Sequence, residues 1–448
     1  MGKVINKTSE TLSGYKHYFI DLLVLAFPLL IGNLGHILMG ATDVLVVAKY
    51  NIDSLAAISI ANSILFTIFI FGIGLICAVS IVLANKRGAR QKTKKYLLST
   101  LIFATVLAVL FSLICYSSKF LLPYFGFEAH LLPYIDEYIT IVSFSMFGMF
   151  FYDGIKQFLQ SYEIVKFPNL ILLFAVIVNL ILDITFVFGI GSIPPMGSKG
   201  AAIATLTVRT LMGLIMLVYV YRFINFKADI DFSYMKHIIK IGYPIGAALL
   251  LEFLAFNIVT ILVGRESGLL AATHNILTTI SSATFMIPLS ISTALSVKIA
   301  YYYGARKTYE IKRFSISGLI IGVGFMAFAA VCFALFPKQL ISLFTDNQSV
   351  LEVALPIMMI AAMYQIFDGF QVVSGGILKG FKLTKFVSNA VFLGYWIVGM
   401  PLAVILVGKY HMSLLGYWIA LAVSLCVMGF VQAAMAKYKF NEIKELYK

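Results

Sequence analysis

The sequence predicts an all-α polytopic membrane protein, with twelve transmembrane helices in two six-helix bundles around a central cavity. Composition is the first reason: of 448 residues, 61% are hydrophobic and only 12% are charged. An average soluble domain is about 45–50% apolar and about 25% charged, so this chain has too few charges to cover a surface that faces water. The composition therefore excludes soluble, disordered and fibrous proteins and leaves a membrane protein.

Long apolar runs between charged or Gly/Pro-rich breaks are the second reason. A bilayer core needs about 20 mostly apolar residues per helix, whereas barrel strands would alternate over about ten residues. The first run is too long for a signal-peptide core and has no small-residue cleavage site, so we expect it to be a permanent span. The twelve expected spans are 19–47, 54–84, 96–118, 132–155, 168–190, 200–222, 241–263, 270–299, 314–336, 350–375, 386–408 and 414–436.

An internal repeat is the third reason. Six spans per half is an even number, so both halves enter the membrane in the same direction, as parallel repeats. The expected domains are an N-terminal bundle at 1–222, a cytoplasmic linker at 223–240 and a C-terminal bundle at 241–448. The segments that match at offsets of 215 or 216 residues are FPLL near Pro28 with YPIG near Pro244, RGAR at 87–90 with YGAR at 303–306, SLAA at 54–57 with LLAA at 269–272, YDG at 152–154 with FDG at 367–369, and GAAIA at 200–204 with GYWIA at 416–420.

Lys and Arg are distributed unevenly between the two sides of the spans. Segments on the side of both termini hold 27 of the 34 basic residues, and the opposite segments hold 6. Because basic residues remain on the cytoplasmic side, we expect both termini in the cytoplasm and the chain in the plasma membrane, the inner membrane of a bacterium. The expected partners are the lipid bilayer and small organic cations. No basic groove with interleaved aromatic residues predicts a nucleic-acid partner, and we expect a monomer.

Polar residues within the first, fifth and sixth spans predict an ion-binding cluster. A carboxylate at mid-bilayer costs roughly 2.5–3.5 kcal/mol on insertion scales, so each one is a candidate functional residue. At about 1.5 Å per residue, these side chains lie about 9–12 Å inside the outer boundary. Their oxygen atoms suit a cation such as Na⁺, and their carboxylates alternatively bind H⁺. The cluster consists of Asp43, Asn179, Asp183 and Thr205.

Arg209 offers a structural alternative for the same cluster. It follows Thr205 by four residues and therefore lies on the same helix face, one turn deeper. There it would neutralise Asp183 as an ion pair. A carboxylate that is neutral, or bonded to a neighbouring hydroxyl for helix packing, is a further structural explanation of the intramembrane acids.

The C-terminal half carries a second pair of acids. Glu252 and Asp368 both lie about 16–18 Å from the cytoplasmic boundary, which predicts one site for a substrate cation or Na⁺. Asp153 is the repeat counterpart of Asp368, and we expect it to pair with Lys156 near the membrane interface. His36 is the counterpart of Glu252 and is expected to be a hydrogen-bonded core residue.

The remaining sequence signals concern hinges and chemistry. Pro28 and Pro244 occupy equivalent positions in the first span of each half, where a missing backbone hydrogen bond allows a helix to bend, so both are expected hinges.

No nucleotide-binding, metalloprotease or serine-hydrolase motif is present, and the four cysteines show no metal spacing. We therefore expect no enzyme activity and no cofactor other than a coupling ion, Na⁺ or H⁺.

These segments resemble the MATE family of multidrug and toxin extruders over about residues 19–436. The similar stretches are GNLGHILMGATDVLVVAKYNIDSLAAISIANSI, VNLILDITFVFG, GSKGAAIATLTV, LLLEFLAFNIVTILVG and YQIFDGFQVVSGGILKGFK. They contain Asp43, Glu252 and Asp368 at positions where the family has acidic residues. They also contain the polar residues of the fifth and sixth spans that match the family. The resemblance implies export of organic cations and drugs by antiport against Na⁺ or H⁺.

The chain departs from either bacterial branch of the family taken alone. NorM-like members rely on the C-terminal acids and often lack the fifth-span Asp, whereas DinF-like members emphasise the N-terminal cluster. This sequence carries both sets, so it leaves the coupling ion and the dominant half open. A lipid-linked oligosaccharide flippase of the same superfamily is the alternative function, although its cavity should carry several Arg and Lys residues, and here Arg209 is the one basic residue that is not counted with a loop or a span end.

Overall fold

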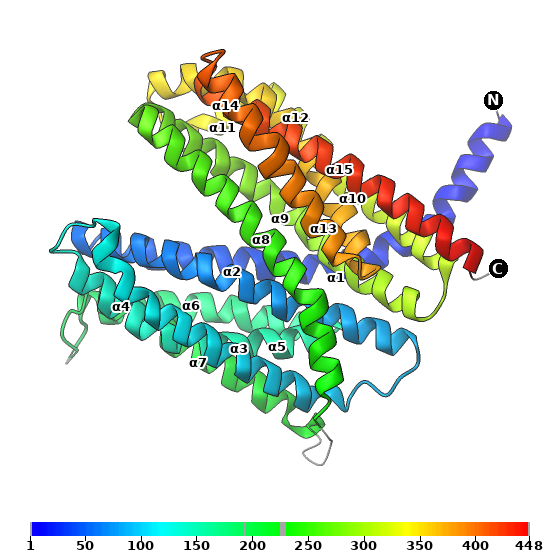
Figure 1. Cartoon of the computed structure of the whole chain (residues 1–448), viewed down its shortest axis with the longest axis horizontal. Helices are drawn as coiled ribbons and strands as arrows, with labels where there is room; N and C mark the ends of the chain where they lie inside the picture. The colour runs from blue at the N-terminus through cyan, green and yellow to red at the C-terminus, as the bar shows by residue number, and fades with distance from the viewer. Residues whose placement is uncertain (1, 192, 225–229, 447–448) are drawn as a thin grey trace. The chain divides into compact units, whose positions relative to one another are not determined.

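The computed structural model of the chain describes residues 2–191, 193–224 and 230–446, and all elements in these ranges are helical (Figure 1). In the first half they are α1 (Gly2–Ala48), α2 (Ile52–Gly88), α3 (Tyr96–Ser118), η1 (Lys119–Phe125), α4 (Leu132–Phe144), α5 (Met146–Gln160), α6 (Lys166–Phe188), α7 (Ser198–Val220) and η2 (Tyr221–Phe223). In the second half they are α8 (Phe232–Glu266), α9 (Gly268–Gly304), α10 (Thr308–Leu335), α11 (Pro337–Ser342), α12 (Gln348–Gly380), α13 (Thr384–Phe392), η3 (Leu393–Gly399), α14 (Met400–Gly408) and α15 (Ser413–Leu446).

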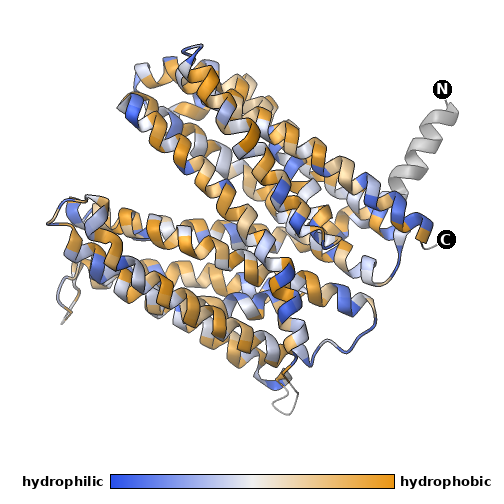
Figure 2. Cartoon of the chain, viewed as in Figure 1, coloured by the Kyte–Doolittle hydropathy of each residue, from blue (hydrophilic) through white to orange (hydrophobic). Residues whose placement is uncertain are grey.

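Twelve helical segments of the described residues are long and apolar enough to cross a membrane, which confirms the predicted fold class and span count. Hydrophobic residues predominate along the helices, and hydrophilic residues gather at many of the helix ends and loops (Figure 2). Three of the spans are composite. The third joins α3 and η1, the fourth joins α4 and α5 at Ser145, and the eleventh joins α13, the π-helical η3 and α14.

Two compact units divide the chain, at points that the hydropathy pattern does not mark. One unit contains Met1–Leu30, Ala84–Arg90 and Ala247–Lys448, and the other contains Ile31–Leu83 and Gln91–Gly246. We call them unit 1 and unit 2. The sequence placed the boundaries at 222 and 241 instead. The expected linker at 223–240 lies partly outside the described residues, and it is helical from Phe232 onward.

Three long helices therefore contribute to both units. The change of unit falls between Leu30 and Ile31 in α1, between Leu83 and Ala84 in α2, and between Gly246 and Ala247 in α8. Hydropathy reports whether a segment crosses the membrane, but it carries no information on which bundle each half of a helix packs against.

Close helix contacts in unit 2 hold the helices that carry the candidate site. A Cβ atom built on Gly148 of α5 would lie 2.3 Å from the backbone carbonyl oxygen of Arg209 on α7. Small residues permit this kind of backbone approach between helices in lipid, where packing rather than the hydrophobic effect drives helix association. Gly148 thus fixes the distance between α5 and the helix that bears Thr205 and Arg209.

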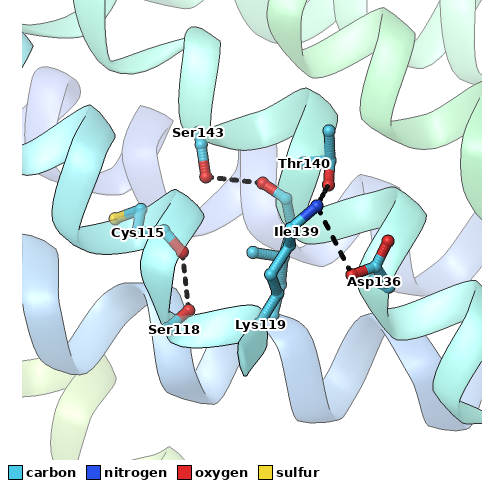
Figure 3. Close-up of polar contacts among 7 residues, drawn as sticks. All are labelled: Cys115, Ser118, Lys119, Asp136, Ile139, Thr140 and Ser143. Carbon is cyan, nitrogen blue, oxygen red and sulfur yellow. Dashed lines mark hydrogen bonds and ion pairs between the residues drawn. The ribbon is translucent and has the colours of Figure 1, made fainter. Parts of the chain in front are cut away.

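Ion pairs at one end of unit 2 fix α4 between its neighbours. Lys119 Nζ, at the end of α3, lies 3.7 Å from Asp136 Oδ1 and 3.4 Å from Thr140 Oγ1, both on α4 (Figure 3). Lys199 Nζ, in the first turn of α7, lies 2.6 Å from Glu137 Oε1. Ion pairs that solvent reaches are weak, so these two orient α4 more than they stabilise it.

Candidate ion-binding sites

The four polar residues predicted for the N-terminal half form one hydrogen-bonded cluster in unit 2. The Asn179 amide nitrogen Nδ2 donates to Asp43 Oδ1 at 2.7 Å and to Asp183 Oδ2 at 2.5 Å. Thr205 Oγ1 donates to Asp43 Oδ2 at 3.1 Å. Side chains from α1, α6 and α7 therefore meet at Asp43, and a single amide group links the two carboxyl groups.

The side chains of this cluster are buried, which affects the charge that its two carboxyl groups can carry. Asp43 is 4% exposed, Thr205 is 2% exposed, and Asn179 and Asp183 are fully buried. Two carboxylates this close in a medium of low dielectric constant cannot both remain ionised without a compensating positive charge. Charge balance in the cluster therefore requires a proton, a bound cation or the positive charge of a neighbouring side chain.

Two acceptor atoms of the cluster have no hydrogen-bond partner among the described residues. They are Asn179 Oδ1 and Asp183 Oδ1, and both are buried. Buried polar atoms are nearly always satisfied, so unpaired oxygens beside a carboxyl pair point to an additional donor or a cation. The residues present fit both Na⁺, which binds oxygen ligands, and H⁺, which would convert one carboxylate into a donor.

Arg209 does not form the ion pair with Asp183 that the sequence left open. Its Nη1 atom instead donates to Ser145 Oγ at 2.9 Å, and its Nε atom is buried without a partner in the described part of the chain. The guanidinium still acts electrostatically on Asp43. The Arg209 side chain points toward Ser145, at the junction of α4 and α5, whereas Asp183 lies on α6.

A first prediction follows from this arrangement. Asp183→Asn should reach the expression level of the wild-type protein, because no buried Arg loses an ion-pair partner. Breaking a buried pair would cost about 3–5 kcal/mol and most of the folded protein. Quantifying the membrane-inserted protein by fluorescence-detected size exclusion, with Asp136→Asn as the exposed control, tests the arrangement. A large loss in Asp183→Asn that Arg209→Met restores would mean that the two groups pair after all.

The acids of the C-terminal half lie in unit 1 and lack a direct hydrogen bond to each other within the described residues. Asp368 on α12 is 4% exposed, and Glu252 on α8 is partly buried. They are close enough to interact electrostatically. The Tyr395 hydroxyl donates to Glu252 Oε1 at 3.3 Å, and Trp396 Nε1 donates to the Leu251 carbonyl oxygen at 3.2 Å.

Two aromatic residues at this site, Tyr395 and Trp396, did not stand out in the sequence. Both belong to η3, a π-helical segment that contains Gly394 and Gly399, and π-helical turns inside α-helices often occur at functional sites. One signal was available: Tyr395 is the repeat counterpart of Asn179 at the offset of 216, and both residues donate to an intramembrane carboxylate. With 24 Tyr and 38 Phe in the chain, residue type alone did not distinguish it.

Asp153, Lys156 and His36 differ from the sequence expectation. Asp153 is 6% exposed and Lys156 is 9% exposed, so both side chains are buried within unit 2. Among the described residues they form no ion pair with each other, and the Lys156 ammonium lies 5.7 Å from the centroid of the Tyr152 ring. His36 is half-buried, and no hydrogen bond joins it to another described residue. It is therefore not the hydrogen-bonded core residue expected.

The two predicted hinge prolines lie beside the points at which helices change unit. Pro28 is two residues before the change in α1, and Pro244 is two residues before the change in α8. A proline lacks the backbone donor of a helical turn, so bending costs less there. The hinge function stays a prediction.

Pro28→Ala should therefore slow turnover by several-fold and leave substrate affinity nearly unchanged, because the added backbone hydrogen bond stiffens α1 without altering a carboxylate. Initial rates of dye efflux at a series of dye concentrations separate turnover from affinity. Pro356→Ala, which changes a proline inside α12, is the matched control. Wild-type turnover at full expression would show that Pro28 is a tolerated kink.

Comparison with known proteins agrees with this architecture. The MatE family model matches residues 28–185 and again 244–405, so the two matches begin 216 residues apart, at the two prolines. A probable multidrug resistance protein NorM of Mesorhizobium japonicum is 30% identical over 424 residues, covering 91% of each chain. The multidrug resistance protein NorM of Vibrio vulnificus is 28% identical over 427 residues, covering 92% of this chain and 93% of its own.

Solved structures share the fold. The Vibrio cholerae MATE transporter VcmN in its bent form superimposes with a TM-score of 0.88 at 18% identity, covering 97% of this chain and 99% of that one. The eukaryotic MATE transporter AtDTX14 does so with a TM-score of 0.83 at 19% identity, covering 97% of this chain and 100% of its own. Twelve spans, a repeat matched twice by one family model and full-length relatives together show that this chain belongs to the MatE family of MATE transporters.

Proposed function

We propose that the protein is a secondary active antiporter that exports organic cations and drugs in exchange for Na⁺ or H⁺ by alternating access. The observation that carries the proposal is the cluster of Asp43, Asn179 and Asp183, with two carboxyl groups and two unpaired oxygens buried together. The names of the relatives, multidrug resistance proteins, support the substrate class. No catalytic motif supports an enzyme function.

The N-terminal cluster is proposed to bind the coupling ion. The amide of Asn179 holds the two carboxyl groups together, and Thr205 orients the second oxygen of Asp43. When the ion leaves, the carboxylates regain charge, and the empty site favours a cation again. Each elementary charge that crosses the membrane with the potential contributes about 2.3 kcal/mol per 100 mV, which drives the exchange.

The C-terminal acids are proposed to compete for the coupling ion and the substrate cation. A carboxylate can bind either charge, and competition at one site produces exchange. Phe256 packs against Tyr395 with ring centroids 5.8 Å apart, so aromatic rings adjoin Glu252. Cations bind aromatic faces with about 0.5–2 kcal/mol, and this contact depends little on the shape of the ligand.

Neutralising the C-terminal acids should lower dye efflux to below about half of the wild-type rate. Glu252→Gln and Asp368→Asn keep the size and most hydrogen bonding of each side chain, so a loss would report charge and not packing. Glu442→Gln, on the last turns of α15, is the exposed control. If both variants stay above half of the wild-type rate, these acids do not form a cation site.

We also propose that the chain lies in the bacterial inner membrane with both termini in the cytoplasm, because 27 basic residues lie on the side of the termini and 6 on the opposite side.

A flippase for lipid-linked oligosaccharides remains the alternative function. Its pyrophosphate ligand requires free cationic groups, whereas Arg209 is hydrogen bonded to Ser145 inside unit 2.

Ethidium efflux from cells that express the protein tests the proposed function. Efflux should stop on addition of an uncoupler if H⁺ is the coupling ion, and on replacement of Na⁺ by choline if Na⁺ is. Cells without the protein supply the background rate. Ethidium retention equal to that of cells without the protein, under every condition, would refute export of this substrate class.

A further inference from the structure

The π-helical segment η3 in unit 1 packs against α15 through two glycines. A Cβ atom built on Gly394 would lie 2.2 Å from Met428 Cγ, and one built on Gly399 would lie 2.2 Å from Ser424 Oγ. The two glycines are five residues apart in η3, whereas Ser424 and Met428 are four residues apart on α15. Five residues of η3 therefore cover the same length of contact as one turn of α15.

The π-helical geometry is the reason that both glycines can face α15. In an α-helix of 3.6 residues per turn, residues five apart point in directions that differ by about 140°. In a π-helix the hydrogen bonds join residues i and i+5, so residues at this spacing lie on nearly the same side. The Met400 backbone N–H donates to the Tyr395 carbonyl oxygen in this pattern. A regular α-helix would turn one of the two glycines away from α15.

Two consecutive side chains of η3 bind α8. The Tyr395 hydroxyl donates to Glu252 Oε1 at 3.3 Å. Trp396 Nε1 donates at 3.2 Å to the carbonyl oxygen of the preceding residue, Leu251. The Tyr395 ring also packs against the Phe256 ring, one turn further along α8, with centroids 5.8 Å apart at 64°. The glycines thus fix η3 to α15, and these three contacts fix it to α8 around Glu252.

The Tyr395 hydroxyl can hold the Glu252 carboxylate without neutralising it. Tyr395 is 2% exposed, and in the described part of the chain it is the one residue that donates a hydrogen bond to this carboxyl group. Hydrogen bonds to an ionised acceptor are roughly twice as strong as bonds between neutral groups, and they favour the ionised form. A phenol adds no positive charge, in contrast to Lys or Arg. The negative charge of Glu252 and its second oxygen therefore remain available for a cation.

We propose that Tyr395 is a positioning residue of the C-terminal site, which holds Glu252 Oε1 and leaves Oε2 to bind the coupling ion or the substrate cation. Tyr395 acts through Glu252, and the contacts of η3 with α15 set its position. The proposal rests on the antiport function above and deepens it, because it assigns the group that prepares Glu252 for a cation.

Ethidium binding to the purified full chain, measured by fluorescence anisotropy, tests this role. Tyr395→Phe keeps the ring and its contact with Phe256 but removes the donor. We expect the affinity for ethidium to fall about tenfold, since hydrogen bonds to charged groups contribute about this factor or more. In efflux assays the KM for ethidium should rise by a similar factor. The maximal rate per folded protein should change less than about twofold, because both acids are retained.

Tyr417→Phe is the matched control, because Tyr417 also donates to a carboxylate of α8, Glu266 Oε1 at 3.1 Å, at the end of that helix. It should bind ethidium with the wild-type affinity. An affinity of Tyr395→Phe equal to that of this control would overturn the proposal.

A double variant separates the hydrogen bond from packing of the ring. Added to Glu252→Gln, Tyr395→Phe should cause no further loss of affinity, because the carboxylate that it holds is already gone. A tenfold loss in that background as well would assign Tyr395 a packing role and overturn the proposal. If Glu252→Gln binds no ethidium, the comparison with Tyr417→Phe decides alone.

Gly394→Ala tests whether η3 sets the position of Tyr395. The new methyl group would begin 2.2 Å from Met428 Cγ, and Met428 is fully buried, so η3 must move away from α15 and carry the hydroxyl with it. We expect the same loss of affinity as in Tyr395→Phe. Gly408→Ala in the same span is the matched control, because a Cβ atom there meets nothing within 4 Å.

Wild-type affinity in folded Gly394→Ala would overturn the positioning role of η3. If this variant does not fold, Tyr395→Phe decides alone. A wild-type protein that neither binds nor exports ethidium would instead refute the proposed antiport itself.

Discussion

Asp43→Asn should abolish coupled dye efflux while the protein still inserts and folds. The substitution removes one of the two carboxylates that Asn179 links, so the cluster no longer needs a compensating proton or Na⁺. The amide retains the size of the carboxyl group, and loss of a buried charge is not expected to harm folding. We expect the efflux rate to fall to the level of cells without the protein.

The measurement is ethidium efflux normalised to the amount of membrane-inserted protein. Asp53→Asn is the matched control, because it makes the same chemical change at a side chain that is 51% exposed in the first turn of α2. Efflux by Asp43→Asn at the wild-type rate would remove the coupling role of the N-terminal cluster. Loss of the protein from the membrane would assign Asp43 a structural role instead.

Gly148→Val should cause a large loss of stability, because it disrupts a close helix contact of unit 2. The new side chain would begin 2.3 Å from the carbonyl oxygen of Arg209, where only backbone can yield. Overpacking in a well-packed core costs typically about 1–3 kcal/mol, and here α7 must also shift, which moves Thr205 away from Asp43. We expect a lower melting temperature and no efflux.

Thermal melting of the purified detergent-solubilised protein measures this loss. Gly324→Val on α10 is the matched control, because a Cβ atom there meets nothing within 4 Å. It makes the same change in helix propensity without a steric clash. Equal melting temperatures for the two variants would mean that α5 and α7 do not approach as closely as described.

Most of the fold was predictable from hydropathy and charge, and the reason is physical. In lipid each spanning segment must satisfy its own backbone hydrogen bonds, so every span appears in the sequence as a long apolar run. The repeat offset of 216 residues was also readable, and the double match to one family model confirms it. The packing of single helix halves was not readable, because α1, α2 and α8 change unit without a change in composition.

The N-terminal cluster was predictable because charge within a membrane is rare. Counting residues from the nearest loop placed Asp43, Asp183 and Thr205 at one depth, and the structure brings them together with Asn179. Direction within the membrane plane was not predictable. For that reason the sequence left open whether Arg209 meets Asp183, and it paired Asp153 with Lys156, although the Lys156 ammonium lies over the Tyr152 ring instead.

At the C-terminal site, the two acids were predictable from the sequence but the aromatic residues around them were not. Aromatic residues are frequent throughout this apolar chain, so residue type did not single them out. The contacts of Tyr395 with Glu252 and of Trp396 with Leu251, which the sequence does not show, distinguish these two rings from other aromatic residues of the chain.

The most direct test of the central claim is dye transport by the purified protein in proteoliposomes under an imposed ion gradient. Ethidium movement should follow a gradient of H⁺ or of Na⁺, stop when that gradient is collapsed, and be absent in Asp43→Asn under the same gradient. Ethidium movement that is indifferent to both gradients, or equally fast in the wild-type and Asp43→Asn proteins, would contradict antiport through this cluster.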